Sequence, residues 1–144
     1  MTLKKISLAV FILGSLALLG VSGHLFGLNK TSIKESPKYK NLLSNYIVVK
    51  NKYQVCMVND IYNPMADFRP FMVEVDSEKY YGCCPMCKAK LSNSNFFRVA
   101  LDPLTKTPVK KSESFIVADK LHNGKTHYFA SENNFLKWIE KRSK

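Results

Sequence analysis

Residues 81–87 read Tyr-Gly-Cys-Cys-Pro-Met-Cys, and this stretch holds three of the four cysteines of the chain. A β-rich run precedes it. A helix is predicted to begin at Cys84 or Pro85 and to end near Leu91, because proline suits the first turn of a helix. The sequence therefore predicts a strand, a tight corner and a helix here, with the thiols gathered at the corner.

The same layout recurs at residues 128–134, Tyr-Phe-Ala-Ser-Glu-Asn-Asn. Each stretch follows a strand with a charged turn, residues 76–79 in the first case and 122–125 in the second. Ser131 is a suitable N-cap for a second helix, which places Phe135, Trp138 and Ile139 on one face. When the stretches are aligned, the three cysteines are matched by Ala130, Ser131 and Asn134. We interpret the pair as one unit present twice, with thiols in the first copy only.

The distribution of β-rich runs predicts an α+β fold of two small units, each with short antiparallel strands and one helix, after an N-terminal hydrophobic helix. With 144 residues the chain has room for one modest globular region, which excludes a multidomain enzyme. The cysteine-bearing unit is assigned to residues 46–95 and the degenerate unit to residues 96–144. A polar tether over residues 29–45 ends in a short helix near residues 39–45. The expected strands are residues 46–49, 71–75, 80–81, 96–101, 115–118 and 126–129.

The first 28 residues are predicted to be a signal peptide or a membrane anchor. Lys4 and Lys5 precede an uncharged apolar run from Ile6 to Gly23, which is the layout of an export signal. Residues 21–23, Val-Ser-Gly, are an acceptable cleavage site, whereas an uncleaved run extended to Leu28 is long enough to span a bilayer. Either alternative predicts export to the periplasm or another extracytoplasmic face of the membrane.

The charge is strongly basic, +11 with 22 Lys and Arg against 11 Asp and Glu. Most of this excess lies after the apolar run and is spread along the chain, not gathered into one patch. Export would also separate the protein from nucleic acid, so no nucleic-acid partner is predicted. Attraction to anionic lipid headgroups beside the N-terminal segment is favoured over nucleic-acid binding, and an ordinary solvated surface is favoured over both.

The four cysteines, Cys56, Cys83, Cys84 and Cys87, fall within 32 residues of one another. Thiolates are preferred ligands of Cu(I) and Zn(II). Cys83 and Cys87 are one helical turn apart, and a helix N-terminus favours the thiolate form that binds metal. Cys56 would have to come from another strand or loop.

Methionines crowd the same half of the chain. Met57, beside Cys56, and Met86, between Cys84 and Cys87, are predicted auxiliary ligands for Cu(I), because a thioether is a soft neutral donor. Met65 and Met72 are predicted to fill the core.

His127 is predicted to be a structural strand residue. The dispersed carboxylates form no acid and base pair, so no catalytic residue is predicted and the protein is expected not to be an enzyme.

These residues together resemble the small heavy-metal domains called TRASH and YHS. Cys56-Met57 resembles their early Cys-Met, and Cys83 and Cys87 their Cys-x-x-x-Cys pair. Residues 102–109 look like the opening of a second YHS unit. The arrangement of two units is similar to that of the nitrous oxide reductase maturation lipoproteins, which are copper carriers. The resemblance implies a metal-binding module for trafficking, buffering, sensing or resistance, with a partner protein that donates or accepts the metal.

Three features depart from the family pattern. The 26 residues between Cys56 and Cys83 exceed the usual TRASH spacing, Cys84 is an additional thiol, and a lipoprotein cysteine is lacking.

Two other hypotheses use the same thiols. Residues 84–87, Cys-Pro-Met-Cys, have the form of a redox pair at a helix N-terminus, with Cys84 as the nucleophile of thiol-disulfide exchange. Alternatively, two disulfides such as Cys84 with Cys87 and Cys56 with Cys83 would brace a small exported domain. Metal binding is favoured because the thiols and methionines cluster in one copy only. The predicted ligands are Cys56, Cys83 and Cys87 for Cu(I), with Zn(II) second, and Cys84 is a ligand that can swing in.

Overall fold

The structure is a computed structural model that describes residues 34–144. The apolar run predicted to be a signal or an anchor lies outside these residues. Among residues 34–144, no helix combines the length and the apolar character that a membrane span requires.

The centre of the fold is a five-stranded antiparallel sheet with the order β1-β8-β9-β3-β2. Its longest strands, β8 (Phe115–Asp119) and β9 (Lys125–Phe129), pair with Val117 opposite His127. Gly124 has a φ of +75°, and a Cβ there would lie 2.5 Å from the Tyr62 carbonyl oxygen, so the connection between these strands requires glycine. The remaining strands of this sheet are β1 (Tyr46–Val48), β2 (Val55–Cys56) and β3 (Ile61–Tyr62).

Two hairpins lie beside the sheet. The first pairs β4 (Met72–Val75) with β5 (Glu78–Tyr81), and the second pairs β6 (Val99–Leu101) with β7 (Pro108–Lys110). Asp76 and Ser77 join β4 to β5 with φ angles of 51° and 64°, the left-handed pair that a tight two-residue hairpin turn needs.

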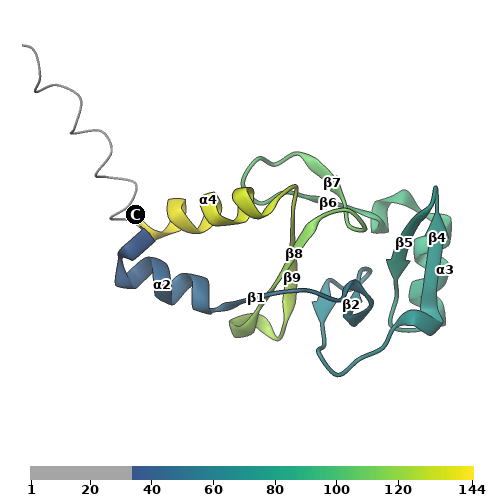
Figure 1. The fold of residues 1–144 in the computed structure, drawn as a ribbon. Coiled ribbons are helices and arrows are strands. Elements are labelled where there is room, and N and C mark those ends of the chain that lie inside the picture. Colours follow the sequence, from purple (N-terminus) through teal and green to yellow (C-terminus); the bar gives the residue numbers. More distant parts are fainter. Residues whose placement is uncertain (1–33) are drawn as a thin grey trace, which may run out of the picture.

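Among residues 36–144, three helices complete the fold: α2 (Pro37–Ser44), α3 (Pro85–Asn93) and α4 (Glu132–Ser143). In Figure 1, α2 and α4 lie together on one side of the central strands, and α3 lies against the β4-β5 hairpin on the other. Four short 3-10 turns connect the elements: η1 (Lys52–Gln54), η2 (Arg69–Phe71), η3 (Asn95–Phe97) and η4 (Lys120–His122).

The alternation of side chains along β8 explains these layers. Val117 points into a core shared with α2 and α4, whereas Ile116 and Ala118 point into a second core shared with the β4-β5 hairpin and α3. Tyr39 of α2 is 4% exposed in the first core. Part of the segment assigned to the tether is therefore packed against the fold.

The mixed α and β composition and the antiparallel strands confirm the predicted α+β class, and the division into two units stays a prediction. The strand predicted over residues 96–101 is wrong at its start. The Ser94 hydroxyl accepts a hydrogen bond from the Phe96 N–H and begins a 3-10 turn, so the strand starts only at Val99. Strands β2, β3 and β7 were not predicted, because two or three residues are too few for a periodic signal.

Candidate metal centre

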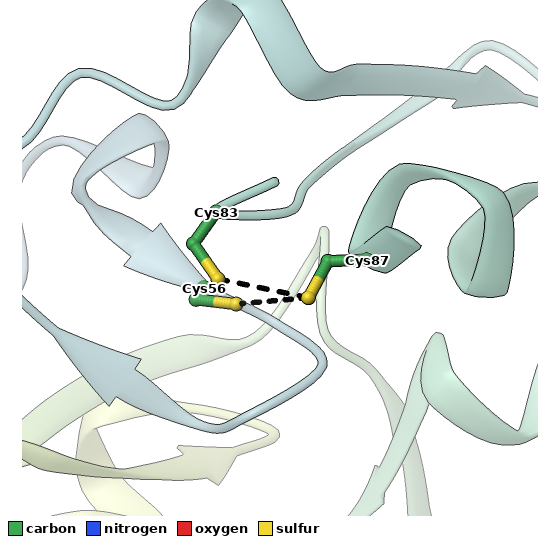
Figure 2. A group of neighbouring side chains, drawn as sticks. All are labelled: Cys56, Cys83 and Cys87. Atoms are coloured by element: carbon green, nitrogen blue, oxygen red, sulfur yellow. Dashed lines mark hydrogen bonds between the residues drawn. The ribbon is translucent and has the colours of Figure 1, made fainter. Parts of the chain in front are cut away.

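Three thiols meet between the central sheet and the start of α3. The Sγ atoms of Cys83 and Cys87 are 3.6 Å apart, and those of Cys56 and Cys87 are 3.9 Å apart (Figure 2). All three sulfurs lie within 4.8 Å of one another, and no other group of three or more His, Cys, Asp or Glu ligands converges in this way within residues 34–144. Cys56 and Cys87 are buried, and Cys83 is partly exposed. The structure thus joins the cysteine that is remote in sequence to the pair at the corner.

Backbone pairing brings Cys56 to this place. Cys56 is the last residue of β2, and its neighbour Met57 donates its N–H to the Tyr81 carbonyl oxygen at 2.8 Å. Tyr81 is the last residue of β5, one position before Gly82. The end of β2 is therefore hydrogen-bonded to the end of β5, and Cys56 faces the thiols of the corner that follows β5.

Gly82 allows α3 to approach the strand end closely. A Cβ on Gly82 would lie 2.8 Å from the Cys87 Cβ and 3.0 Å from the Cys87 carbonyl carbon, closer than side chains tolerate. The absence of a side chain at residue 82 is thus what permits Cys87 to sit over the corner.

Cys84 is the N-cap of α3 and is not one of the three converging thiols. Its Sγ accepts a hydrogen bond from the Cys87 N–H at 3.4 Å, and Pro85 follows at the first helical position. Cys84 is partly exposed. The fourth thiol therefore lies beside the cluster, on the side toward solvent.

The thiols differ in the pKa that their surroundings impose. Burial raises the pKa of Cys83 and of Cys87, so these thiols hold their protons when no cation is near. The Cys87 N–H lowers the pKa of the Cys84 thiol by bonding to its sulfur. A metal that binds the cluster must therefore displace protons from it.

A buried polar network holds the loop that follows Cys56. The Lys111 ammonium, 4% exposed, donates to the Met57 carbonyl oxygen and to Asp60 Oδ1, both at 2.6 Å. The Tyr128 hydroxyl donates to the same Asp60 oxygen at 2.9 Å. These residues were not predicted from the sequence, because Asp60 and Lys111 are isolated charges 51 positions apart without a motif around them.

The predicted auxiliary ligands lie in different surroundings. Met57 is fully buried in the hydrophobic core, and Met86 is 68% exposed beside Cys87. The prediction that Met65 fills the core is wrong, because this side chain is 91% exposed. The His127 ring packs against Trp138 at 5.7 Å between ring centroids, as expected of a structural residue.

A second corner, where β9 leads into α4, has the same backbone layout and no thiols. Ser131 is the N-cap, with φ −160° and ψ 162° against −161° and 170° for Cys84, and its hydroxyl accepts from the Asn134 N–H at 3.2 Å. The place of Cys56 is taken by Asp102, which is fully buried. One carboxylate oxygen of Asp102 accepts 2.8 Å hydrogen bonds from the Ala130 N–H and the Asn134 side-chain amide.

Comparison with known proteins finds no matching protein-family model, and neither a curated protein nor a solved structure matches the chain significantly.

The spacing of the three sulfurs fits a single thiophilic ion. Sulfurs about 2.3 Å from a common metal lie about 3.8 to 4.0 Å apart in tetrahedral or trigonal geometry. The 3.6 Å and 3.9 Å separations are close to these values. Small rotations of the side chains are enough to bring all three sulfurs onto one ion, so the cluster is compatible with metal binding.

Proposed function

We propose that this protein binds one soft metal ion through Cys56, Cys83 and Cys87 and carries or buffers it, with Cu(I) preferred to Zn(II). The observation that supports the proposal most strongly is the convergence within 4.8 Å of three thiols, one from the end of β2 and two from the corner between β5 and α3. Three thiols at such distances in a partly buried corner are an unusual concentration of reactive groups if they serve packing alone.

The number of ligands supports Cu(I) over Zn(II). Structural zinc sites are almost always four-coordinate, and a fourth Cys, His, Asp or Glu ligand is not part of this group within residues 34–144. Cu(I) can be three-coordinate with thiolate ligands, and soft sulfur ligands favour it over harder metal ions. Zn(II) would need water or a movement of Cys84 to complete its coordination.

The titration of the full-length chain with each metal tests this proposal. The protein is kept reduced and anaerobic, with a mild detergent for the apolar N-terminal run, and is titrated against a competing chelator of known affinity. We expect one Cu(I) per chain, tighter than Zn(II), and loss of this binding in Cys83→Ser. A chain that binds neither metal stoichiometrically contradicts the proposal.

We further propose that the apolar run of residues 6–23 exports the domain and that the chain works at the extracytoplasmic face of the membrane. Two lysines before an uncharged run support this. Fractionation of cells that produce the chain, with and without residues 1–28, tests it. A full-length chain found in the cytoplasm contradicts it.

A second function is favoured by the position of Cys84. This partly exposed thiol has a lowered pKa and lies three residues before Cys87, the layout of a thiol-disulfide exchange pair. The Cys84 thiolate would attack a substrate disulfide, and Cys87 would then displace the reduced substrate, leaving a Cys84–Cys87 disulfide. Reduction of one equivalent of oxidised glutathione by the wild type and by Cys83→Ser, but not by Cys84→Ser, would support this function.

A further inference from the structure

The sulfurs of the α3 corner form a series from the interior to the surface. Cys56 and Cys87 are 2% and 5% exposed, Cys83 and Cys84 are partly exposed, and Met86 is 68% exposed. The last four of these lie within the first helical turn of α3 or directly before it. The exposure of these sulfur-bearing residues therefore rises from the buried cluster to the surface of the corner.

Cys84 occupies the middle of this series. Its sulfur accepts a hydrogen bond from the Cys87 N–H at 3.4 Å, yet it is not one of the three sulfurs that converge. It can thus reach an ion in the cluster by a small movement, while the cluster keeps three ligands without it.

The chain around this corner is positively charged. Residues 79–101 contain four basic residues and no acidic residue. Two of the four, Arg98 and Lys90, are engaged with the Leu91 carbonyl oxygen and the Phe97 ring. The other two are exposed: Lys79 lies opposite the exposed Glu74 in the β4-β5 pairing, whereas Lys88 directly follows Cys87 and forms no ion pair within residues 34–144. The approach to the cluster is therefore suited to a negatively charged partner.

We propose that Cys84 is the exchange thiol through which the bound ion leaves and enters, and that the partner is a protein with two cysteines within an acidic surface. This inference rests on the proposed metal binding and adds the route and the partner to it. Lys88, next to Cys87, attracts the acidic surface, and Cys84 meets the incoming thiolates first.

The exchange is a series of ligand replacements without change in oxidation state. The Cys84 thiol releases a proton and forms a bond to the ion, and the bond to Cys83, the most accessible of the three ligands, breaks. The freed Cys83 thiolate takes up a proton. The first thiolate of the partner then replaces another ligand in the same manner, so each bond that forms is balanced by one that breaks.

Cys84→Ser separates exchange from binding. Serine keeps the N-cap, because Ser131 caps α4 with nearly the same backbone angles, so the helix is expected to remain folded. The full-length wild type and the variant are loaded with Cu(I). Transfer is then followed to a fluorescent Cys-x-x-Cys peptide flanked by glutamates, to the same peptide flanked by lysines, and to glutathione.

We expect Cys84→Ser to keep one Cu(I) per chain with an affinity within about threefold of the wild type, and to transfer it at least about tenfold more slowly, because a neighbouring thiol acts at a high effective concentration. The glutamate peptide should accept Cu(I) faster than the lysine peptide, and this difference should shrink in high salt. Glutathione should be the slower acceptor at equal thiol concentration.

Three results overturn the inference, and each differs from failure of the proposed function. Unchanged transfer by Cys84→Ser means that the ion leaves by another route, although the metal site stands. A loss of affinity as large as that in Cys83→Ser makes Cys84 a resident ligand. Faster transfer to glutathione than to either peptide replaces the protein partner by a small thiol. Only a wild type that binds no ion contradicts the proposed function itself.

Discussion

At the end of β5 the chain turns into α3 through Cys83 and Cys84, and at the end of β9 it turns into α4 through Ala130 and Ser131. Both corners have an N-cap in the same extended conformation, and both are met by a residue from the end of an earlier strand, Cys56 in one case and Asp102 in the other. The Asp102 carboxylate receives four N–H groups, whereas Cys56 meets two thiols.

This difference shows what the fold itself requires. Asp102 closes the α4 corner with hydrogen bonds alone, so a corner of this shape needs no metal to be stable. Thiols are poor hydrogen-bond partners, and three of them together are satisfied best by a soft cation. The α3 corner thus carries thiols that its fold does not require, and this difference between the corners supports the proposal of metal binding. That the corners arose as two copies of one unit stays a prediction.

The largest effect is expected from removing a thiol of the cluster. Cys87→Ser should weaken Cu(I) binding by well over 100-fold, because even residues outside the ligand set cost about 10- to 100-fold at metal sites. The matched change at the α4 corner, Asn134→Ser, should leave binding unaltered. Competition titration measures both, and equal affinities for the two variants would refute the ligand assignment.

Thiols introduced at the α4 corner should create a second site. The triple change Asp102→Cys, Ala130→Cys and Asn134→Cys places three thiols on the backbone that now holds the Asp102 hydrogen bonds. We expect the stoichiometry to rise from one Cu(I) per chain to two, measured by metal analysis after gel filtration. A folded triple variant, by circular dichroism, that still binds one ion would show that the corners are not equivalent.

Metal binding at the α3 corner should weaken steeply in acid. Burial raises the pKa of Cys83 and Cys87, so both are protonated near neutral pH and binding releases their protons. With at least two protons released per ion, the affinity should fall by at least about 100-fold for each unit of pH. Affinities measured between pH 6 and about 8 check this, and a pH-independent affinity contradicts it.

Gly82 and Phe129 stand at equivalent positions before the two helices, so the corners also differ in how closely the helix approaches. Gly82→Ala places a Cβ against Cys87 and should destabilise the fold by about 1 to 3 kcal/mol, as overpacking does. It should also weaken metal binding by displacing the Cys87 sulfur. Chemical denaturation and metal titration measure the two effects. An alanine variant with wild-type stability and affinity would show that the close approach is unimportant.

The smallest effect is expected at Asp102. Burial raises the pKa of this carboxyl, but hydrogen bonds from Asn134, Ala130, Leu104 and Thr105 outweigh it, and the net pKa is lowered. The carboxylate therefore stabilises the fold above its ordinary pKa of 3.8, and this contribution is lost as the pH falls through the lowered value. Asp102→Asn should cost about 1 kcal/mol at neutral pH.

Denaturation at several pH values tests this expectation. The difference between the wild type and Asp102→Asn should vanish in acid, where both side chains are neutral. Metal affinity should be the same in both proteins. A difference in stability that persists below about pH 3 would contradict the role of the charge.

The sequence predicted the α+β class, both helix starts and the three converging cysteines, because proline, an N-cap and thiol spacing are local signals. It did not predict how Cys56 reaches the corner, since that depends on a two-residue strand and on one hydrogen bond to Tyr81. The ion pair between Lys111 and Asp60 could not be predicted either, because the two residues meet only through tertiary packing. The burial of Tyr39 depends on the contact between α2 and α4, which no local pattern reveals.

The central claim is that three thiols, and not the fourth, hold one ion. Rapid alkylation of the Cu(I)-loaded full-length chain, followed by mass spectrometry of its peptides, tests this residue by residue. We predict one Cu(I) per chain, protection of Cys56, Cys83 and Cys87, and alkylation of Cys84. A chain without bound copper, or one in which Cys84 is protected and a member of the cluster is alkylated, would contradict it.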